Sequence, residues 1–243
     1  MTHERSFFTR ILWVPISVSL TLSAAAQNVI YDNSVNDTTN RFSAPPPAGH
    51  GNEFGDEINV IGGVGQYLSR FSFEFYGTNG LGGGGAFSGT VTAQVRFYEM
   101  TGPPTNGYPT PALIPFFEST AFTVPTTDVD GRATFLFSSG LDWANGGLFL
   151  PATNITWSVQ FSGLLEADDV GVDIYDPVTV GQNFPDYWER NVFGDWELKT
   201  NVVNMNFAAR FETPEPSSVA LFVLGGLGLF YASQRRRKPQ PQT

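Results

Sequence analysis

The sequence predicts an all-β protein whose antiparallel strands pack as a β-sandwich or jelly roll. Several stretches alternate apolar and polar residues with a period of two, which is typical of strands with one buried face. No stretch between residues 27 and 213 keeps an apolar period of 3.6 residues, so no helix is expected there. Gly (26) and Pro (17) are frequent, which suits short strands joined by many turns.

The alternation is clearest in four stretches and weaker in four others. The clear stretches are 71–76, 91–98, 155–161 and 205–211, and the weaker ones are 57–61, 116–124, 132–137 and 170–175. Eight or more strands within the 187 residues from 27 to 213, without an internal repeat of fixed length, favour a sandwich over a propeller or solenoid.

Turn residues separate these strands. Asp130-Gly131 lies between the stretches that contain Phe122 and Phe135, and this dipeptide predicts a hairpin that joins them. The glycine run 80–85 and the proline-rich segment 102–115 predict loops. The glycine run fits G-x-G-x-x-G, but a strand follows it, so no helix N-terminus is available there for a phosphate.

Composition excludes several function classes. The net charge of −10 argues against nucleic-acid binding, which needs a basic surface. The chain has no cysteine, so disulfides, Cys-metal sites and Cys nucleophiles are excluded. The only histidines are His3 and His50, which leaves a His-based active site short of its parts. We therefore expect a protein that is not an enzyme.

Residues 1–26 have the three parts of a secretory signal peptide. Arg5 and Arg10 precede the apolar run 11–22, and Ala24 and Ala26 form an A-x-A cleavage site. The run has 12 residues, whereas a membrane-spanning helix needs about 20. We expect signal peptidase to cut after Ala26; the alternative is an uncleaved N-terminal anchor.

The C-terminus predicts a single transmembrane helix over residues 217–233. Its 17 residues would span about 26 Å as a helix, the short limit for crossing a bilayer. A basic cluster follows and should stay on the cytoplasmic side, which places the domain before the helix across the membrane. The cluster consists of Arg235, Arg236, Arg237 and Lys238. A buried core helix is the alternative, but the run has no polar face.

Together, Pro214-Glu215-Pro216, the Gly- and Leu-rich segment and the basic end resemble the PEP-CTERM sorting signal of exported bacterial proteins. The resemblance covers residues 214–238. It implies recognition by an exosortase, a membrane protease that would cut near the Pro-Glu-Pro and release or transfer the exported domain. It also implies export across the inner membrane, a transient membrane anchor, and then a place at the cell surface or outside the cell.

The domain between these signals, residues 27–213, has one acidic stretch that could bind Ca²⁺. Glu166, Asp168, Asp169, Asp173 and Asp176 fall within 11 residues. Carboxylate oxygens are the ligands that Ca²⁺ prefers. Asp169 and Asp173 would project from the same face of a strand. The alternative is a solvated acidic rim without a metal, and no other cofactor is expected.

An aromatic segment follows and could stack on a sugar ring. Tyr187 and Trp188 lie in a segment that we expect to be a loop, and Trp196 is close in sequence. The alternative is that these rings pack against the sandwich.

The sequence therefore favours a non-enzymatic surface or extracellular-matrix protein in the envelope of a Gram-negative type of bacterium. A lectin-like module, Ca²⁺-dependent or not, that binds extracellular polysaccharide is the alternative. A glycoside hydrolase or lyase built on two carboxylates is a third hypothesis. The domain holds 7 basic and 21 acidic residues, which gives a net charge of −14, and the other six of the 13 basic residues lie in the two targeting segments.

Overall fold

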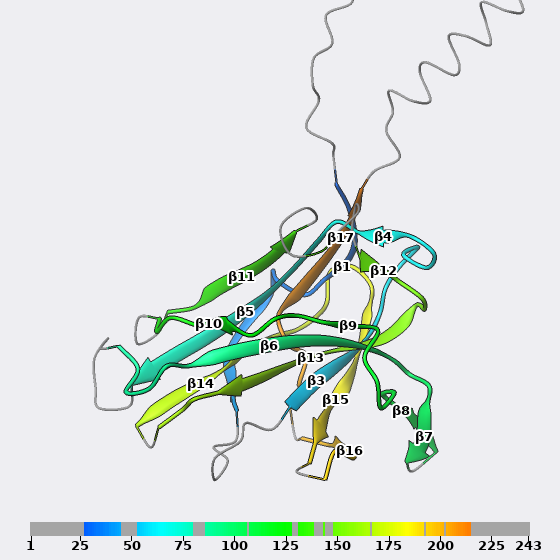
Figure 1. Cartoon of the computed structure of the whole chain (residues 1–243). Helices are drawn as coiled ribbons and strands as arrows, with labels where there is room; N and C mark the ends of the chain where they lie inside the picture. Colours follow the sequence, from blue (N-terminus) through cyan, green and yellow to red (C-terminus); the bar gives the residue numbers. More distant parts are fainter. Residues whose placement is uncertain are drawn as a thin grey trace, which may run out of the picture.

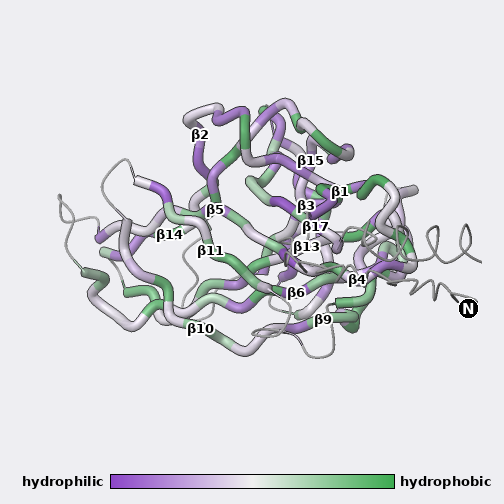
Figure 2. The backbone as a smooth tube through the Cα atoms, turned by 90° about the horizontal axis from the view of Figure 1, so that it is seen from above, coloured by the Kyte–Doolittle hydropathy of each residue, from purple (hydrophilic) through white to green (hydrophobic). Residues whose placement is uncertain are grey.

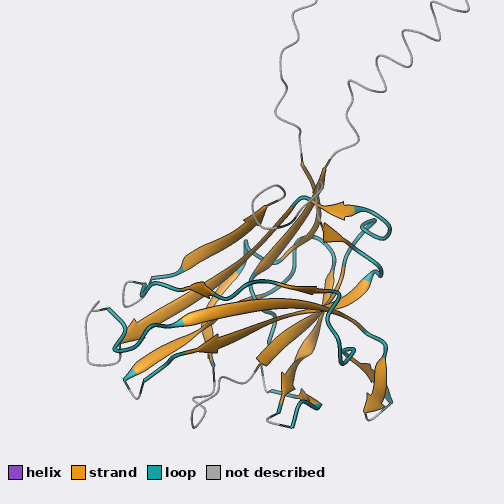
Figure 3. Ribbon diagram, viewed as in Figure 1, coloured by secondary structure: helices purple, strands orange, loops and turns teal. Residues whose placement is uncertain are grey.

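The computed structural model shows an all-β protein, which confirms the predicted class (Figure 3). All its strand pairs are antiparallel. Within the described residues, no helix has the length and hydrophobicity of a membrane span. The predicted signal peptide and the predicted span at 217–233 lie outside the described residues. The structure describes residues 27–44, 53–79, 86–105, 107–127, 131–138, 143, 148–165, 167–191, 193–201 and 203–214.

The first main sheet has six strands, in the order β1-β17-β5-β14-β2, with β11 on the other edge of β5. β17 and β14 pair with successive parts of β5, so the long strand β5 joins the two halves of the sheet. The strands are β1 (Gln27–Asp32), β17 (Ala209–Pro214), β5 (Arg70–Asn79), β14 (Asp168–Tyr175), β2 (Asp37–Ser43) and β11 (Ala133–Ser138).

The second main sheet has seven strands, in the order β10-β6-β13-β3-β15-β16, with β9 also paired to β6. Its strands are β10 (Phe122–Thr123), β6 (Thr92–Glu99), β13 (Asn154–Ser162), β3 (Glu53–Asn59), β15 (Gln182–Arg190), β16 (Trp196–Lys199) and β9 (Phe117–Glu118). Two small sheets pair β4 (Tyr67–Leu68) with β12 (Leu148–Phe149) and β7 (Gly102–Thr105) with β8 (Tyr108–Thr110).

The two main sheets enclose one aromatic core, as in a β-sandwich. Every second residue of the clear strands is buried, because successive side chains of a strand point to opposite faces. Phe71 on the first sheet lies 4.9 Å from Phe97 and 5.5 Å from Trp157 on the second, measured between ring centroids. Such edge-to-face ring pairs add to the burial of apolar area.

The predicted hairpin at Asp130-Gly131 is wrong. β10 pairs with β6 in the second sheet, whereas β11 pairs with β5 in the first, so the chain crosses between the sheets here. Phe122 and Phe135 do meet, but as stacked rings 3.8 Å apart across the core. The expected loops are also partly wrong, because 102–115 contains β7 and β8 and the aromatic segment forms β15.

The two ends of the domain meet at one pole of the sandwich. β1 and β17 pair along their length, with Gln27 opposite Pro214 and Asp32 opposite Arg210. Figure 1 shows the start of β1 and the end of β17 side by side, and the view from above in Figure 2 agrees. The residue after the predicted signal cleavage therefore lies beside the first residue of the Pro-Glu-Pro motif.

One carboxyl group lies in the core itself. Asp56 on β3 is completely buried, and its Oδ2 accepts a hydrogen bond of 3.0 Å from the backbone N–H of Phe207. Its Oδ1 has no hydrogen-bond partner among the described residues. Burial raises the pKa of Asp56 well above its ordinary value, the bond from Phe207 opposes this rise, and nearby Glu57 adds to it.

We expect Asp56→Asn to reduce the loss of stability at higher pH. Because the folded-state pKa of Asp56 is raised, its contribution to the free energy of unfolding is fully present below about pH 4. This contribution falls as the pH rises toward the folded-state pKa. Asparagine does not ionise and can still accept the bond from Phe207. Urea unfolding between pH 4 and 8 should give a flatter profile for the variant, and equal slopes would contradict the assignment.

Candidate functional site

A pocket lies on the outer face of the first sheet, over β2 and β14. Its volume is about 370 Å³. Two carboxylate groups, two guanidinium groups and one threonine line it. The lining residues are Asp37, Thr39, Arg41, Arg132 and Asp173. Strands carry most of these side chains, so the sheet holds them rigidly.

Ion pairs tie the charged groups of this pocket together. Arg41 Nε lies 3.3 Å from Asp173 Oδ1. Arg132 pairs with Asp37 and donates a hydrogen bond to the hydroxyl of Tyr175. That hydroxyl in turn donates to Glu74 Oε2 at 2.6 Å. The pocket therefore presents donors and acceptors in close alternation.

The backbone of β2 is strained at the pocket. Thr39 has φ 62°, a left-handed conformation that is unfavourable for a β-branched residue. Asp37 Oδ1 accepts the backbone N–H of Thr39 at 2.8 Å, which helps to hold this conformation. Strain of this kind often gathers at functional sites, so it marks the pocket as a candidate.

Asp173 is the most deeply buried group of the pocket, with 3% of its surface exposed. Burial raises its pKa to about 6, Arg41 opposes this rise, and Glu74 adds to it. Asp173 thus keeps one buried carboxylate oxygen, Oδ2, without a hydrogen-bond partner among the described residues.

The two acids predicted to bind Ca²⁺ do share a face of β14. Asp169 accepts hydrogen bonds from the hydroxyls of Ser43 and Tyr76, and Asp173 pairs with Arg41. The described residues contain no group of three or more His, Cys, Asp or Glu side chains suited to a metal. Calcium binding stays a prediction, and the positive charge of Arg41 beside Asp173 disfavours it.

Of the predicted sugar-stacking rings, Trp188 and Trp196 are buried and Tyr187 is partly buried, so this prediction is wrong and the alternative, packing against the sandwich, holds. Trp188 is 1% exposed and Trp196 is 6% exposed. The ring of Tyr187 faces the other way, into the core, 4.8 Å from Phe42 and 6.0 Å from Phe207. The reason is that the segment is a strand, β15, which turns successive rings to opposite faces.

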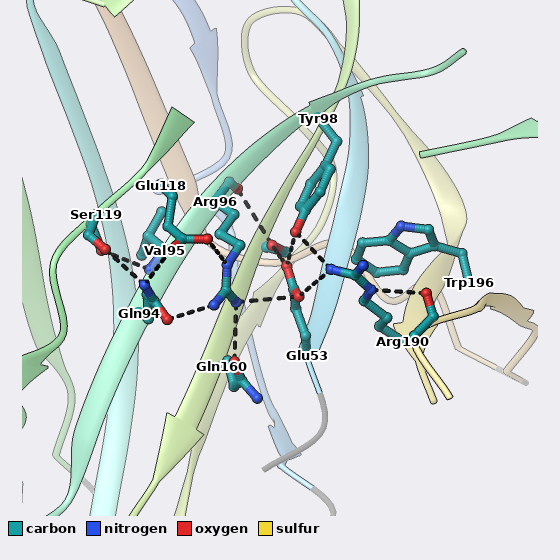
Figure 4. A network of polar contacts seen from close by, with 12 residues as sticks. Glu53, Gln94, Val95, Arg96, Tyr98, Glu118, Ser119, Gln160, Arg190 and Trp196 are labelled. Atoms are coloured by element: carbon teal, nitrogen blue, oxygen red, sulfur yellow. Dashed lines mark hydrogen bonds and ion pairs between the residues drawn. The ribbon is translucent and has the colours of Figure 1, made fainter. Parts of the chain in front are cut away.

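A second polar cluster on the outer face of the second sheet centres on Glu53 (Figure 4). Glu53 is 4% exposed and accepts hydrogen bonds from Tyr98 at 2.7 Å and Ser158 at 2.6 Å. It forms ion pairs with Arg96 at 3.2 Å and with Arg190 at 3.5 Å. The partners come from β6, β13 and β15, so one carboxylate on β3 connects four strands.

The Glu53 cluster is a structural network. Arg96 also binds Glu118 at 2.7 Å and Gln160 at 3.1 Å, as the dashed lines of Figure 4 show. Both carboxylate oxygens of Glu53 have partners, which leaves little for a ligand. The alternation pattern placed Arg96 on a polar face, but its partners depend on strand register, which the sequence does not reveal.

Removal of Glu53 should therefore cost much more stability than removal of Glu118, although both pair with Arg96. Glu53→Ala leaves two guanidinium groups without their buried partner, and we expect a loss of about 3 kcal/mol. Glu118→Ala removes a half-exposed partner and should cost less than about 1 kcal/mol. Urea unfolding of both variants measures the difference, and similar losses would show that the buried cluster is not structural.

The sorting motif begins where the described domain ends. Pro214 is the last residue of β17 and is exposed. Glu215 and Pro216, the basic cluster 235–238, and Ala24 and Ala26 of the predicted cleavage site lie outside the described residues. The structure therefore places the start of the motif but no other part of the two targeting signals.

Comparisons with known proteins point to this same end of the chain. No curated protein and no solved structure matches the chain. Residues 212–237 match the family model of the PEP-CTERM protein-sorting motif. The match includes the last strand residues of β17, the Pro-Glu-Pro tripeptide and the arginines of the basic cluster. By this match, the chain carries a PEP-CTERM protein-sorting motif at residues 212–237.

Proposed function

We propose that this protein is exported through the inner membrane, anchored there as a precursor, and processed by an exosortase into a non-enzymatic surface or matrix protein. The sorting motif at residues 212–237 carries this proposal. Signal peptidase would act at the N-terminus and the exosortase at the C-terminus. The acidic β-sandwich between them is the exported product.

The geometry of the chain ends supports a domain bounded by two processing sites. β1 begins at Gln27, the first residue after the predicted signal cleavage, and β17 ends at Pro214. These two residues are paired in the same sheet. The folded domain thus fills the whole interval between the two signals, without a linker at either end.

The burial of the acidic groups supports a structural role for the domain. Glu53 and Asp173 each pair with an arginine, and Glu57 accepts hydrogen bonds from Trp188 and Asn154. Groups held in this way stabilise strand positions. His50 is the only histidine between the two signals, which leaves a His-based active site short of its parts.

Replacement of Pro214-Glu215-Pro216 by three alanines should leave an unprocessed, membrane-retained precursor. Pro214 is exposed at the end of β17, so the domain should still fold. Pro239-Gln240-Pro241, a similar tripeptide beyond the matched residues, provides the matched control. Immunoblots of membrane and medium fractions measure processing in a host with an exosortase. Normal processing of the first variant, or equal failure of both, would overturn the proposal.

The pocket over β2 and β14 favours a second function, the binding of a neutral saccharide. A sugar hydroxyl both donates and accepts hydrogen bonds, so it suits a pocket where arginines and carboxylates alternate. An anionic sugar would meet Asp37, Asp173 and Glu74, and a divalent cation would meet Arg41 and Arg132. Asp173 lines the pocket beside Arg41 and is the acceptor that such a hydroxyl could use.

We expect Asp173→Asn to weaken binding of neutral hexoses by about tenfold or more, because a hydrogen bond to a charged group contributes about 1.5–3 kcal/mol and about 1.4 kcal/mol is tenfold in affinity. Asp169→Asn, on the same face of β14 but outside the pocket lining, is the control and should bind normally. Saturation-transfer NMR with glucose, galactose and mannose measures binding.

Each other outcome of this experiment identifies a different function. Binding that is lost on addition of EDTA would favour the Ca²⁺-dependent lectin. Release of reducing sugar from oligosaccharides in the same samples would reveal a hydrolase. No binding to any sugar would leave the structural role alone.

A further inference from the structure

Four exposed apolar side chains gather at the pole where the domain begins and ends. They come from the segment that leads into β4 and from its partner β12. We call this surface the apolar pole. Its members are Ile61 (61% exposed), Val64 (47%), Tyr67 (50%) and Phe149 (47%). The rings of Tyr67 and Phe149 lie 5.6 Å apart.

Hydrogen bonds attach this surface to the terminal strands. The backbone N–H of Ser69, directly after β4, donates to the carbonyl of Glu212 on β17 at 2.8 Å. The N–H of Ile61 donates to the carbonyl of Ile30 on β1, also at 2.8 Å. Figures 1 and 2 show β4 beside β1 and β17. The apolar pole therefore lies next to Pro214, where the sorting motif starts.

The segments that form the apolar pole contain no charge. Residues 60–69 and 143–155 have no Asp, Glu, Lys or Arg, although the domain from 27 to 213 has 21 acids and 7 basic residues. Glycines and apolar residues make up most of both segments. An uncharged apolar surface on a strongly acidic domain marks a contact with a partner that is itself apolar or neutral.

The distance to the predicted membrane span identifies this partner. Pro214 is three residues before Ser217, where the span is predicted to begin, and three extended residues reach about 10 Å. The headgroup layer of one leaflet is about 5–8 Å thick. The end of β17 must therefore lie at or within the headgroup layer while the precursor is anchored.

We propose that the apolar pole is a membrane-contact surface that seats the anchored precursor on the lipid headgroups. The inference rests on the proposed function, since it requires the precursor to be anchored at its C-terminus. Tyr67 and Phe149 enter the interface, where aromatic side chains are favoured, and Ile61 and Val64 add apolar area. This contact holds the Pro-Glu-Pro motif at the membrane surface, where a membrane protease can reach it.

A lipid-quenching experiment on the full-length precursor tests this contact. The chain has no cysteine, so Phe149→Cys introduces a single site for an environment-sensitive fluorophore. The precursor is reconstituted into vesicles of phosphatidylethanolamine and phosphatidylglycerol, with and without spin-labelled lipid. Phe193→Cys is the matched control, an exposed phenylalanine (86%) in the β15–β16 turn at the far end of the domain (Figure 1).

We expect the spin-labelled lipid to remove most of the emission of the probe at position 149 and little at position 193. Tyr67→Cys provides a second probe and should be quenched as well. A blue-shifted but unquenched probe would mean that the chain's own apolar segment 219–232 or a second copy covers the pole, which would overturn the inference. Unquenched probes on a precursor that floats with the vesicles would overturn it too. A precursor that does not float would overturn the anchoring on which the proposed function rests.

Discussion

The insertion of β17 between β1 and β5 is the interaction on which the rest of the domain depends. Phe211 on β17 lies 4.8 Å from Phe71 on the neighbouring strand and 5.6 Å from Phe97 on the opposite sheet. Truncation of a core phenylalanine typically costs about 3–5 kcal/mol. The last strand thus completes both the first sheet and the core. Since β17 ends at the sorting motif, the domain can complete its fold only when the chain is present up to that motif.

The charged side chains of the domain form ion pairs that support the two packed sheets. Each of the seven basic residues between positions 27 and 213 takes part in an ion pair with an acidic residue. Several of the acids in these pairs are buried on the outer faces of the sheets, as Glu53 and Asp173 are. Because the 21 acids outnumber the bases, the surface keeps a large negative excess. That excess favours solubility and works against contact with anionic surfaces.

The proposed membrane contact and the acidic surface have complementary effects. An acidic domain is repelled by anionic lipids over most of its surface, whereas the apolar pole carries no charge to be repelled. Together they would orient the anchored precursor with the ends of β1 and β17 toward the bilayer. In the proposed pathway, cutting the anchor would leave four exposed apolar side chains, which by themselves provide only weak attachment to a membrane.

Local patterns in the sequence were sufficient for the strands with alternating residues, for the buried faces of the clearest ones and for the sorting motif, but not for β1, β2, β7, β8, β15 or β16. Alternation reports burial because successive side chains of a strand point to opposite faces, and a sorting signal is read as a linear segment. Partner strands, in contrast, depend on contacts between distant residues. The sequence placed Phe122 and Phe135 in one hairpin, whereas the core stacks them from opposite sheets. The burial of Trp188, the partners of Glu53 and the pairing of Gln27 with Pro214 were likewise decided by strand register, which only the packed sheets specify.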